Sequence, residues 1–418
     1  MNPQRSPRRS LTNVGGQVDL GGRPEDAALL AEALDVPPPP PMSDRTTEDE
    51  GRAHVHGFHA YPARMHPVTA ARLITSFVPE GGSVLDPFCG SGTVLVEAML
   101  QGRDTVGTDL NPLAIALSRA KTRPRAGMPE ALDALAVAAR TVAGFADQRR
   151  REKVGATRRY GKEDTEAFDP HVLLEIDGLR HGVRTIVEPS LQDDLMLVLS
   201  AILVKVSRKE SDTSTAEAPK RIAAGYPSRL FVKKTDELIA RLRELDTRLA
   251  ERDPRPDAQL FLDDATRLEA LPDHSVDAIV TSPPYVATYD YVAHHALRLR
   301  WLGMDASAFD ANELGSRRDY ARLSPHQAWD RWANELHTLL RSLERVVRRG
   351  GAVVLLMADS AVGDEPMPAD DIIASVARET ALECVARASQ PRPHFHKLTR
   401  NAFRMRPRSE HALLLRRR

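Results

Sequence analysis

The stretch Ser83-Val-Leu-Asp-Pro-Phe-Cys-Gly-Ser-Gly-Thr93 predicts a strand, a tight glycine turn and the start of a helix. Residues 83–85 form a short apolar run, and residues 93–101 have the apolar spacing of a helix. A second apolar run over 105–108 follows almost at once. A strand, a helix and a second strand in such close succession are typical of a doubly wound, mostly parallel α/β sheet.

The glycine turn lies at the carboxyl end of the first predicted strand, where an open parallel sheet binds its ligand. Gly90 and Gly92 allow a positive φ and a close approach of backbone to ligand. The turn lacks the third glycine of a dinucleotide site and the Gly-Lys end of a P-loop, which argues against both. Taken alone, the two glycines are equally compatible with a plain structural turn.

Acidic residues follow the predicted strands. Asp109 ends the second strand, where a carboxylate can hold the two hydroxyls of a ribose; the alternative is an N-cap of the next helix. Asp264 follows an apolar run over 259–262 and could accept a hydrogen bond from an exocyclic amine such as that of adenine, or be a solvated loop charge. Because the turn carries no Lys or Arg, these residues favour an adenosine without a phosphate.

A further strand over 276–280 ends in Ser282-Pro-Pro-Tyr285. The two prolines fix two φ angles and remove two amide donors. The hydroxyl of Ser282 and the carbonyl of Pro283 then remain as acceptors beside the aromatic face of Tyr285. The tetrapeptide therefore predicts a site in which a planar amine donates its hydrogens and stacks on the tyrosine.

These motifs resemble those of the amino-methylating DNA methyltransferases that use S-adenosyl-L-methionine. The first motif of that family is matched by Asp86-Pro-Phe-Cys-Gly-Ser-Gly-Thr93 and the catalytic motif by Ser282-Pro-Pro-Tyr285, while Phe58-His-Ala-Tyr-Pro-Ala-Arg64 looks like the motif upstream of the first strand. The resemblance covers residues 52–122 and 257–415 and implies a Rossmann-like class I methyltransferase with a seven-stranded sheet. The cofactor-binding residues it implies, together with those argued above, are Tyr61, Arg64, Asp86, Phe88, Gly90, Gly92, Thr93, Asp109, Asn111 and Asp264.

The resemblance also implies the reaction. In that family a serine in the first place of the tetrapeptide usually goes with the N4 amine of cytosine, and an aspartate with the N6 amine of adenine. Ser282, Pro283, Pro284 and Tyr285 are thus expected to direct methyl transfer to cytosine N4, without a covalent enzyme intermediate. The base would be flipped out of double-stranded DNA, with Tyr289 and Tyr291 as further stacking surfaces. The alternatives are adenine-N6 methylation, an RNA amino-methyltransferase, and a silent nucleic-acid-binding module.

Changes in composition and in predicted secondary structure along the chain indicate its domain organisation. Residues 1–50 are polar, include a proline run over 37–41, and are expected to be a disordered leader. Residues 51–122 and 256–418 are expected to form one split catalytic domain. A largely helical insertion over 123–255 separates them, and its basic clusters make it the candidate target-recognition region.

Two features are expected near the end of the chain. A long amphipathic helix begins with Ser324 as N-cap and Pro325 at the first helical position, and should run to Gly350 and Gly351. A buried strand over 352–357 should follow it. Residues 384–415 are predicted to form two weaker strands around a basic loop.

The net charge of zero, from 58 basic and 58 acidic residues, conceals opposed regions. Residues 251–310 carry 11 acidic and 5 basic residues, whereas residues 390–418 carry nine Lys or Arg against a single acid. The C-terminal region is therefore the best candidate for a DNA-facing surface. Its predicted contact residues are Arg392, Lys397, Arg400 and Arg404, with Arg406 and Arg408 nearby.

Two cysteines and a longest apolar run over 195–206, which is below the ~18 residues of a membrane span, favour a cytoplasmic protein with no membrane partner. The cluster His54-Val-His56-Gly-Phe-His59 has spacing that can bind zinc. Direct methyl transfer needs no metal, so we expect none and interpret the cluster as a loop over the cofactor; His394 and His396 are interpreted similarly. Restriction or phage-defence proteins are candidate partners, and the oligomeric state is open.

Overall fold

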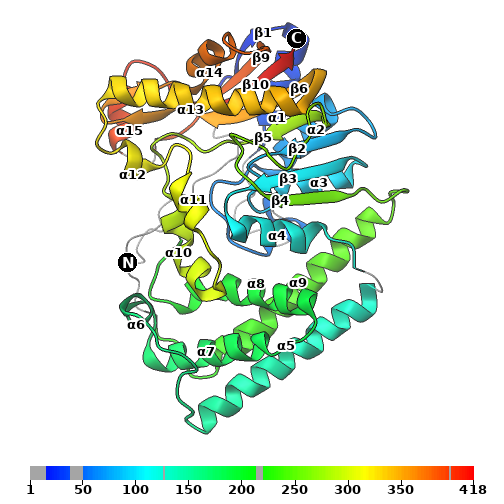
Figure 1. Ribbon diagram of the computed structural model, residues 1–418, viewed down its shortest axis with the longest axis vertical. Helices are drawn as coiled ribbons and strands as arrows, with labels where there is room; N and C mark the ends of the chain where they lie inside the picture. Colours follow the sequence, from blue (N-terminus) through cyan, green and yellow to red (C-terminus); the bar gives the residue numbers. More distant parts are fainter. Residues whose placement is uncertain (1–15, 38–49, 126–127, 213–219, 395–396) are drawn as a thin grey trace.

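Among the residues that the structure describes, a central sheet of eight strands, in the order β1-β9-β10-β6-β5-β2-β3-β4, forms the upper part of the molecule (Figure 1). The computed structural model describes residues 16–37, 50–125, 128–212, 220–394 and 397–418. β7 and β8 form a separate antiparallel pair. The strands are β1 Asp19–Gly22, β2 Ser83–Asp86, β3 Asp104–Asp109, β4 Ala258–Leu262, β5 Val276–Thr281, β6 Val347–Ala358, β7 Ser360–Val362, β8 Glu365–Met367, β9 Leu382–Pro391 and β10 Ser409–Arg417.

The sheet is mostly parallel, as predicted. β6, β5, β2, β3 and β4 run parallel to one another, and β10, β9 and β1 are antiparallel to their neighbours. β2 lies in the middle, with β3 and β4 on one side and β5 and β6 on the other. The order in which strands are added therefore reverses between β2 and β5. The crevice at the carboxyl ends of these two strands is where such sheets bind ligands.

Helices cover both faces of the sheet. Because successive strand residues point to opposite faces, neighbouring Val84 and Leu85 enter different cores. Val84 packs in the core beneath α1 and α2, and Leu85 in the core beneath α13 and α14. The helices around the sheet are α1 Pro24–Leu34, α2 Pro67–Phe77, α3 Thr93–Leu100, α4 Pro112–Thr122, α10 Tyr291–Leu302, α11 Ser307–Ala311, α12 Arg317–Tyr320, α13 Pro325–Val346, α14 Ala369–Ala377 and α15 Lys397–Ala402, with short 3-10 turns η1 Glu50–Arg52 and η2 His54–Gly57.

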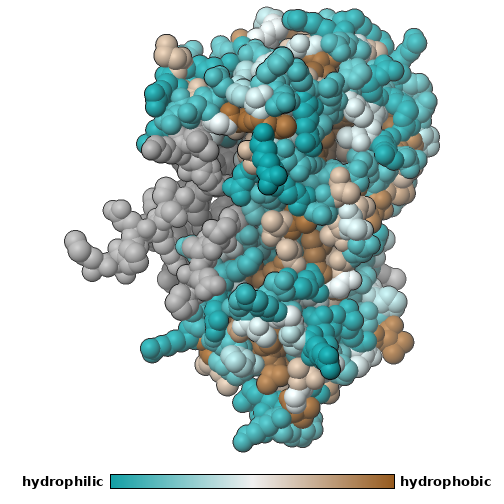
Figure 2. Space-filling model, turned by 60° about the vertical axis from the view of Figure 1, so that its left-hand side comes forward, coloured by the Kyte–Doolittle hydropathy of each residue, from teal (hydrophilic) through white to brown (hydrophobic). Residues whose placement is uncertain are grey.

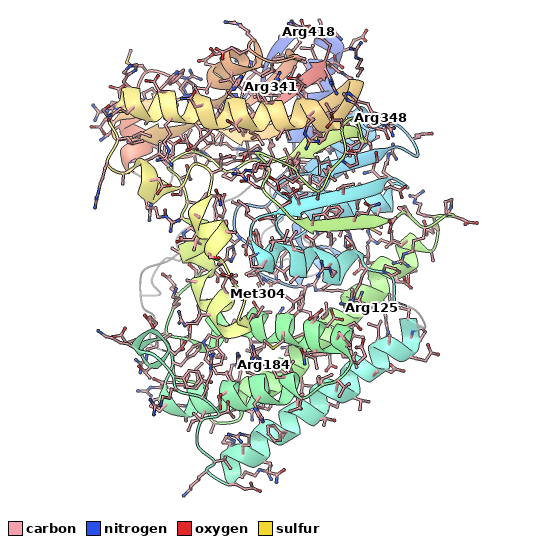
Figure 3. All side chains as sticks on the ribbon, viewed as in Figure 1. Arg125, Arg184, Met304, Arg341, Arg348 and Arg418 are labelled. Carbon is pink, nitrogen blue, oxygen red and sulfur yellow. The ribbon has the colours of Figure 1, made fainter. Side chains whose placement is uncertain are left out.

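In the part of the chain that the structure describes, five further helices form the lower part of the molecule in Figure 1: α5 Met128–Arg151, α6 Lys162–Ala167, α7 Pro170–Arg184, α8 Pro189–Val206 and α9 Tyr226–Leu249. Their apolar faces share one core with α3, α4 and α10, to which Leu117 of α4 and Trp301 of α10 belong. Arg123 and Arg125, which follow α4, pair with the buried Asp194 of α8 at 2.7 and 3.1 Å. Arg125 is labelled at this junction in Figure 3. Apolar packing and buried charge pairs therefore join the two parts.

Figure 2 shows the hydropathy of one face of the molecule. On the face shown in Figure 2, hydrophilic residues cover most of the molecule, and a hydrophobic patch lies at mid-height, between the sheet and the lower helices. Within the described residues, no helix is long and apolar enough to cross a membrane.

The expected disordered leader is wrong for part of residues 1–50, and the sheet has eight strands within the described residues where seven were expected. β1 pairs with β9 along residues 19–22, and α1 buries Ala27, Leu30 and Leu34 against the sheet. α1 begins at Pro24 and has acidic residues in its first turn, both of which favour a helix start. Polar flanks masked this short amphipathic pattern. Residues 1–15 and 38–49, with most of the proline run, lie outside the described residues.

The long amphipathic helix is confirmed at its start and shorter than expected at its end. Ser324 and Gln327 form a capping box at the start of α13. The helix ends at Val346, and β6 begins at Val347, which pairs with Val276 of β5. The predicted stop at Gly350 was wrong because this parallel pairing draws the residues after Val346 into the strand.

Candidate active site

The glycine turn after β2 has no room for a side chain at either of its two glycines. Gly90 and Gly92 have φ of +51° and +79°. A Cβ on Gly92 would lie 2.8 Å from Oγ of Ser118, and a Cβ on Gly90 would lie 3.1 Å from Cε1 of Tyr61. Both positions therefore require glycine, for the backbone conformation and for space. Helix α3 begins directly after the turn, at Thr93.

Asp109 connects this turn to the next helix. Its Oδ2 accepts from the backbone N–H of Gly90 at 2.9 Å, and its Oδ1 accepts from that of Asn111 at 2.8 Å. The N-cap of α4 is Asn111, whose Oδ1 accepts from Leu113 N–H at 3.0 Å. Asp109 is therefore not the N-cap. Burial raises the pKa of Asp109 to about 6, while its two backbone hydrogen bonds act in the opposite direction.

Tyr61 brings the upstream segment to the same place. Its hydroxyl accepts from Nδ2 of Asn111 at 3.2 Å, and its ring stacks on His295 of α10 with centroids 4.8 Å apart. Arg64 donates to the carbonyls of Gly51 and His56 and so holds this segment together.

Asp86, the last residue of β2, joins the first motif to the strand that carries the tetrapeptide. Its Oδ1 accepts from Oγ1 of Thr281, at the end of β5, at 2.6 Å and from Phe88 N–H at 3.1 Å. Burial raises the pKa of Asp86 to about 7. Asp264, after β4, uses Oδ1 to accept from the backbone and hydroxyl of Thr266 at 2.9 and 2.8 Å.

These residues surround one pocket at the carboxyl ends of β2, β3, β4 and β5. Predicted site residues that line it are Tyr61, Arg64, Asp86, Phe88, Gly90, Thr93, Asp109, Asp264, Ser282, Pro284 and Tyr291. Gly92, Asn111, Pro283 and Tyr285 are not among the residues that line it. Sequence reasoning missed Met65, Phe309, Asn312 and Glu313, which also line it. The last three come from the segment around α11, and no local pattern indicates that this segment folds over the tetrapeptide.

The tetrapeptide follows β5 directly. Oγ of Ser282 lies 3.5 Å from the hydroxyl of Tyr285, and that hydroxyl donates to Oε1 of Glu410 in β10 at 3.1 Å. Oε2 of Glu410 accepts from Nε and Nη2 of Arg392 at 2.8 and 2.5 Å. Both side chains of this ion pair are 6% exposed.

Arg392 is therefore wrongly predicted as a DNA contact. The antiparallel register of β9 and β10 sets Gln390 opposite Glu410, so Arg392 lies beside that carboxylate and is buried with it. Arg400 and Arg404 are exposed, as a contact surface requires. The side chain of Lys397 lies outside the described residues. Arg406 pairs with Asp370 and Asp371 at 3.5 and 3.2 Å.

Tyr289 and Tyr291, the predicted stacking residues, lie close together with ring centroids 5.3 Å apart. Tyr291 lines the pocket at the start of α10, whereas Tyr289 does not.

The histidines of the upstream segment do not converge as a trio. His56 Nε2 lies 2.7 Å from Oε1 of Glu97, and His54 Nε2 lies 3.8 Å from the same atom. His59 instead contacts Oγ of Ser200 in α8 at 2.9 Å. His54, His56 and Glu97 are close enough for a metal ion, but the direct hydrogen bond between His56 and Glu97 accounts for their proximity without one. His396 lies outside the described residues.

The fold and the pocket define the class of the protein. A doubly wound sheet with a glycine turn after β2, an acid after β3 and antiparallel final strands is the Rossmann-like architecture of class I methyltransferases. Among solved structures, TrmN from Thermus thermophilus matches 85% of this chain and 49% of its own at 12% identity and a TM-score of 0.33. The class follows from the topology of the sheet and from the motifs at its carboxyl edge.

Comparisons of sequence find similarity to one family of DNA methylases. Residues 36–119 match the model of the N6/N4 DNA methylases, described as DNA methylase. The chain is 27% identical to the type II methyltransferase M.MvaI of Kocuria varians over 272 residues, which are 60% of this chain and 58% of that protein. It is 25% identical to M.BsoBI of Geobacillus stearothermophilus over 280 residues, 60% and 53% of the two chains.

A shorter match, 41% identical over 64 residues, links 15% of this chain to 19% of a tRNA (guanine(10)-N2)-dimethyltransferase of Methanothermobacter thermautotrophicus. The alignments with M.MvaI and M.BsoBI show that the chain spans somewhat more than half the length of each of these two proteins. The resemblance to the amino-methylating DNA methyltransferases is confirmed, and the chain is a distant homologue of type II DNA methyltransferases.

Proposed function

We propose that this protein is a DNA methyltransferase that moves a methyl group from S-adenosyl-L-methionine to an exocyclic amine of a base, with cytosine N4 as the favoured target. One observation carries the proposal. The pocket that holds the glycine turn, Asp109 and Asp264 also holds Ser282 and Pro284 of the tetrapeptide. A cofactor held by the first group would lie beside an amine held by the second.

The residues fit this cofactor. Asp109 and Asp264 offer carboxylates to the ribose hydroxyls and the adenine amine, and Phe88 offers an apolar surface. Among the described residues that line the pocket, Arg64 is the only Lys or Arg, and it is engaged with the carbonyls of Gly51 and His56. The pocket therefore suits an adenosine without a phosphate. When bound, the cofactor supplies an electrophilic methyl group on a sulfonium.

The tetrapeptide is suited to hold the amine. The hydroxyl of Ser282 and the carbonyl of Pro283 accept its two N–H groups and favour a pyramidal nitrogen with a directed lone pair. Neither Pro283 nor Pro284 has an N–H that would compete for these acceptors. Catalysis arises from positioning and from stabilising the positive charge that develops at the amine.

No covalent intermediate is needed, and Cys89 is a poor nucleophile. Its thiol is buried, and burial raises its pKa well above the ordinary value. It contacts Oγ of Ser118 beneath the glycine turn rather than the tetrapeptide.

Double-stranded DNA is the proposed substrate, with Tyr285 and Tyr291 as stacking surfaces for a flipped base. Tyr289, Lys397, Arg400 and Arg404 are proposed to contact the strand. The split catalytic domain over 51–122 and 256–418, with target recognition by residues 123–255, belongs to the same proposal. Adenine N6 is the alternative target. The short match to the tRNA dimethyltransferase supports an RNA substrate as a second candidate.

Purified protein incubated with tritiated cofactor tests the substrate class. We expect transfer to unmodified double-stranded bacterial DNA and none to total tRNA, and Ser282→Ala should abolish the transfer while cofactor binding remains. Transfer to tRNA alone would replace the DNA proposal with the RNA one. Bound cofactor with no transfer to either acceptor would contradict both.

A further inference from the structure

The hydroxyl of Tyr285 lies between the catalytic serine and a buried carboxylate. It donates to Oε1 of Glu410 at 3.1 Å and lies 3.5 Å from Oγ of Ser282, near the outer limit of a hydrogen bond. Tyr285 packs at the edge of the core beneath α13, so its ring is supported on one side by apolar residues. The polar contact with β10 fixes where its hydroxyl points.

The acceptor is itself fixed. Arg392 occupies Oε2 of Glu410 with two hydrogen bonds, which leaves Oε1 facing the tyrosine. A buried ion pair is weak evidence for stability, because desolvation opposes its Coulomb attraction and an apolar pair can often replace it. This pair reaches the tetrapeptide from a strand more than a hundred residues away in sequence. Its orientation toward the site indicates a role beyond packing.

The direction of these hydrogen bonds determines what Ser282 can do. A phenol has one hydrogen, and the carboxylate of Glu410 can only accept it. The oxygen of Tyr285 can then act toward Ser282 only as an acceptor. The hydrogen of Ser282 is drawn toward Tyr285, and the lone pairs of the serine oxygen are left for the pocket.

We propose that Glu410, held by Arg392, is a positioning residue that orients the hydroxyls of Tyr285 and Ser282, so that Ser282 presents an acceptor to the amine of the target base. The inference rests on the proposed function for its substrate. It assigns to the last strand of the sheet a part in the chemistry, and it accounts for the burial of Arg392, the basic residue wrongly expected to face DNA.

A double-mutant cycle on the full-length protein tests the proposal through single-turnover methyl transfer to unmodified bacterial DNA. Glu410→Ala should slow the chemical step by about 10- to 100-fold, the range expected for loss of alignment. KM for DNA and Kd for the cofactor should change by less than about twofold, because neither contact involves Glu410. Glu410→Gln has a single acceptor oxygen, which Arg392 would occupy, so its amide would donate to Tyr285 and the rate should also fall. In a Tyr285→Phe background, Glu410→Ala should have no further effect.

Arg387→Ala is the matched control. It removes an arginine of β9 whose pairs with Asp370 and Asp19 do not reach the tetrapeptide. A rate for Glu410→Ala equal to that of the control, or an equal loss with and without the hydroxyl of Tyr285, would overturn the proposal. If Glu410→Ala fails to fold, Glu410→Gln and Tyr285→Phe complete the same cycle. The loss of rate caused by Glu410→Gln alone should then be smaller than that expected for Glu410→Ala.

A second measurement separates this inference from the proposed function. With 3-fluorotyrosine in place of Tyr285, the fluorine resonance should shift on Glu410→Gln and on Glu410→Ala, but not on Arg387→Ala. If the wild type methylates no nucleic acid and the resonance shifts, the proposed function fails and the contact between Glu410 and Tyr285 stands. If the wild type methylates DNA and the resonance does not respond, the positioning role fails and the function stands.

Discussion

The ring of Tyr61 lies where a side chain on Gly90 would point: a Cβ built on Gly90 would be 3.1 Å from Cε1 of the tyrosine. The two residues are separated in sequence by α2 and β2, yet together they form one wall of the pocket. The glycine turn and the upstream motif thus fit each other, and neither can change independently.

Gly90→Ala is expected to damage the cofactor site more than the fold. The positive φ disfavours alanine by about 1–2 kcal/mol, and the new methyl group displaces Tyr61. Cofactor affinity should fall by more than about tenfold, as titration calorimetry would measure. Gly81→Ala is the control, since Gly81 has φ of +66° but nothing within 4 Å of its Cβ position. It should lower the melting temperature similarly and leave cofactor affinity unchanged; equal losses of affinity would refute the packing argument.

Asp109 should make cofactor binding depend on pH. Burial raises the pKa of Asp109 to about 6, so its carboxylate becomes protonated and a weaker acceptor as the pH falls through 6. Cofactor affinity should decrease between pH 7.5 and pH 5.5, and Asp109→Asn should be weak and nearly independent of pH. Asp104→Asn, at the exposed start of β3, should behave as the wild type. A wild-type affinity that is flat across this range would show that Asp109 does not accept from the cofactor.

Asp86 should make stability depend on pH in the opposite sense to an ordinary paired carboxylate. Burial raises the pKa of Asp86 from 3.8 to about 7, so the folded protein binds more protons than the unfolded chain between these values. The contribution of Asp86 to stability is greatest at low pH and is lost as the pH rises through 7. Relative to the wild type, Asp86→Asn should gain about 3 kcal/mol in unfolding free energy between pH 5 and pH 8. Denaturant unfolding at the two pH values measures this; a constant difference would mean that Asp86 stays ionised.

Arg400 and Arg404 should contribute to DNA binding through phosphates. Both are exposed, whereas Arg406 in the same segment is paired with Asp370 and Asp371. Replacing Arg400 and Arg404 with alanine should weaken binding to any DNA sequence and reduce the salt dependence of log K by about one per lost contact. Arg406→Ala should leave that slope nearly unchanged. Fluorescence anisotropy over a salt series would decide, and equal slopes for all variants would remove this surface from the interface.

The local patterns of the sequence predicted the centre of the sheet well. The run from Ser83 to Thr93 contains its own strand, turn and helix start, so neighbouring residues determine its structure. The same holds for Asp109 and Ser282, since each follows a strand whose parallel pairing brings its carboxyl end to one edge. Pattern and topology together therefore placed most of the pocket.

Other features depend on pairings between distant segments. Arg392 is a basic residue in a basic segment, and only the register of β9 against β10 sets it beside Glu410. β1 and α1 gain their structure from packing on β9 and α2, which the polar composition around them conceals. Glu313 and Phe309 reach the pocket because the segment around α11 folds back over the loop after Tyr285, where Ala287 N–H donates to the carbonyl of Gly315 at 2.9 Å.

Nucleoside mass spectrometry of DNA from cells that express the protein tests the central claim most directly. The proposed role of Ser282 predicts N4-methylcytosine with the wild type and none with Ser282→Ala, whose cofactor affinity should be unchanged. N6-methyladenine in place of N4-methylcytosine would contradict the choice of base. Absence of both modified bases, in cells where the protein is folded and binds S-adenosyl-L-methionine, would contradict the account as a whole.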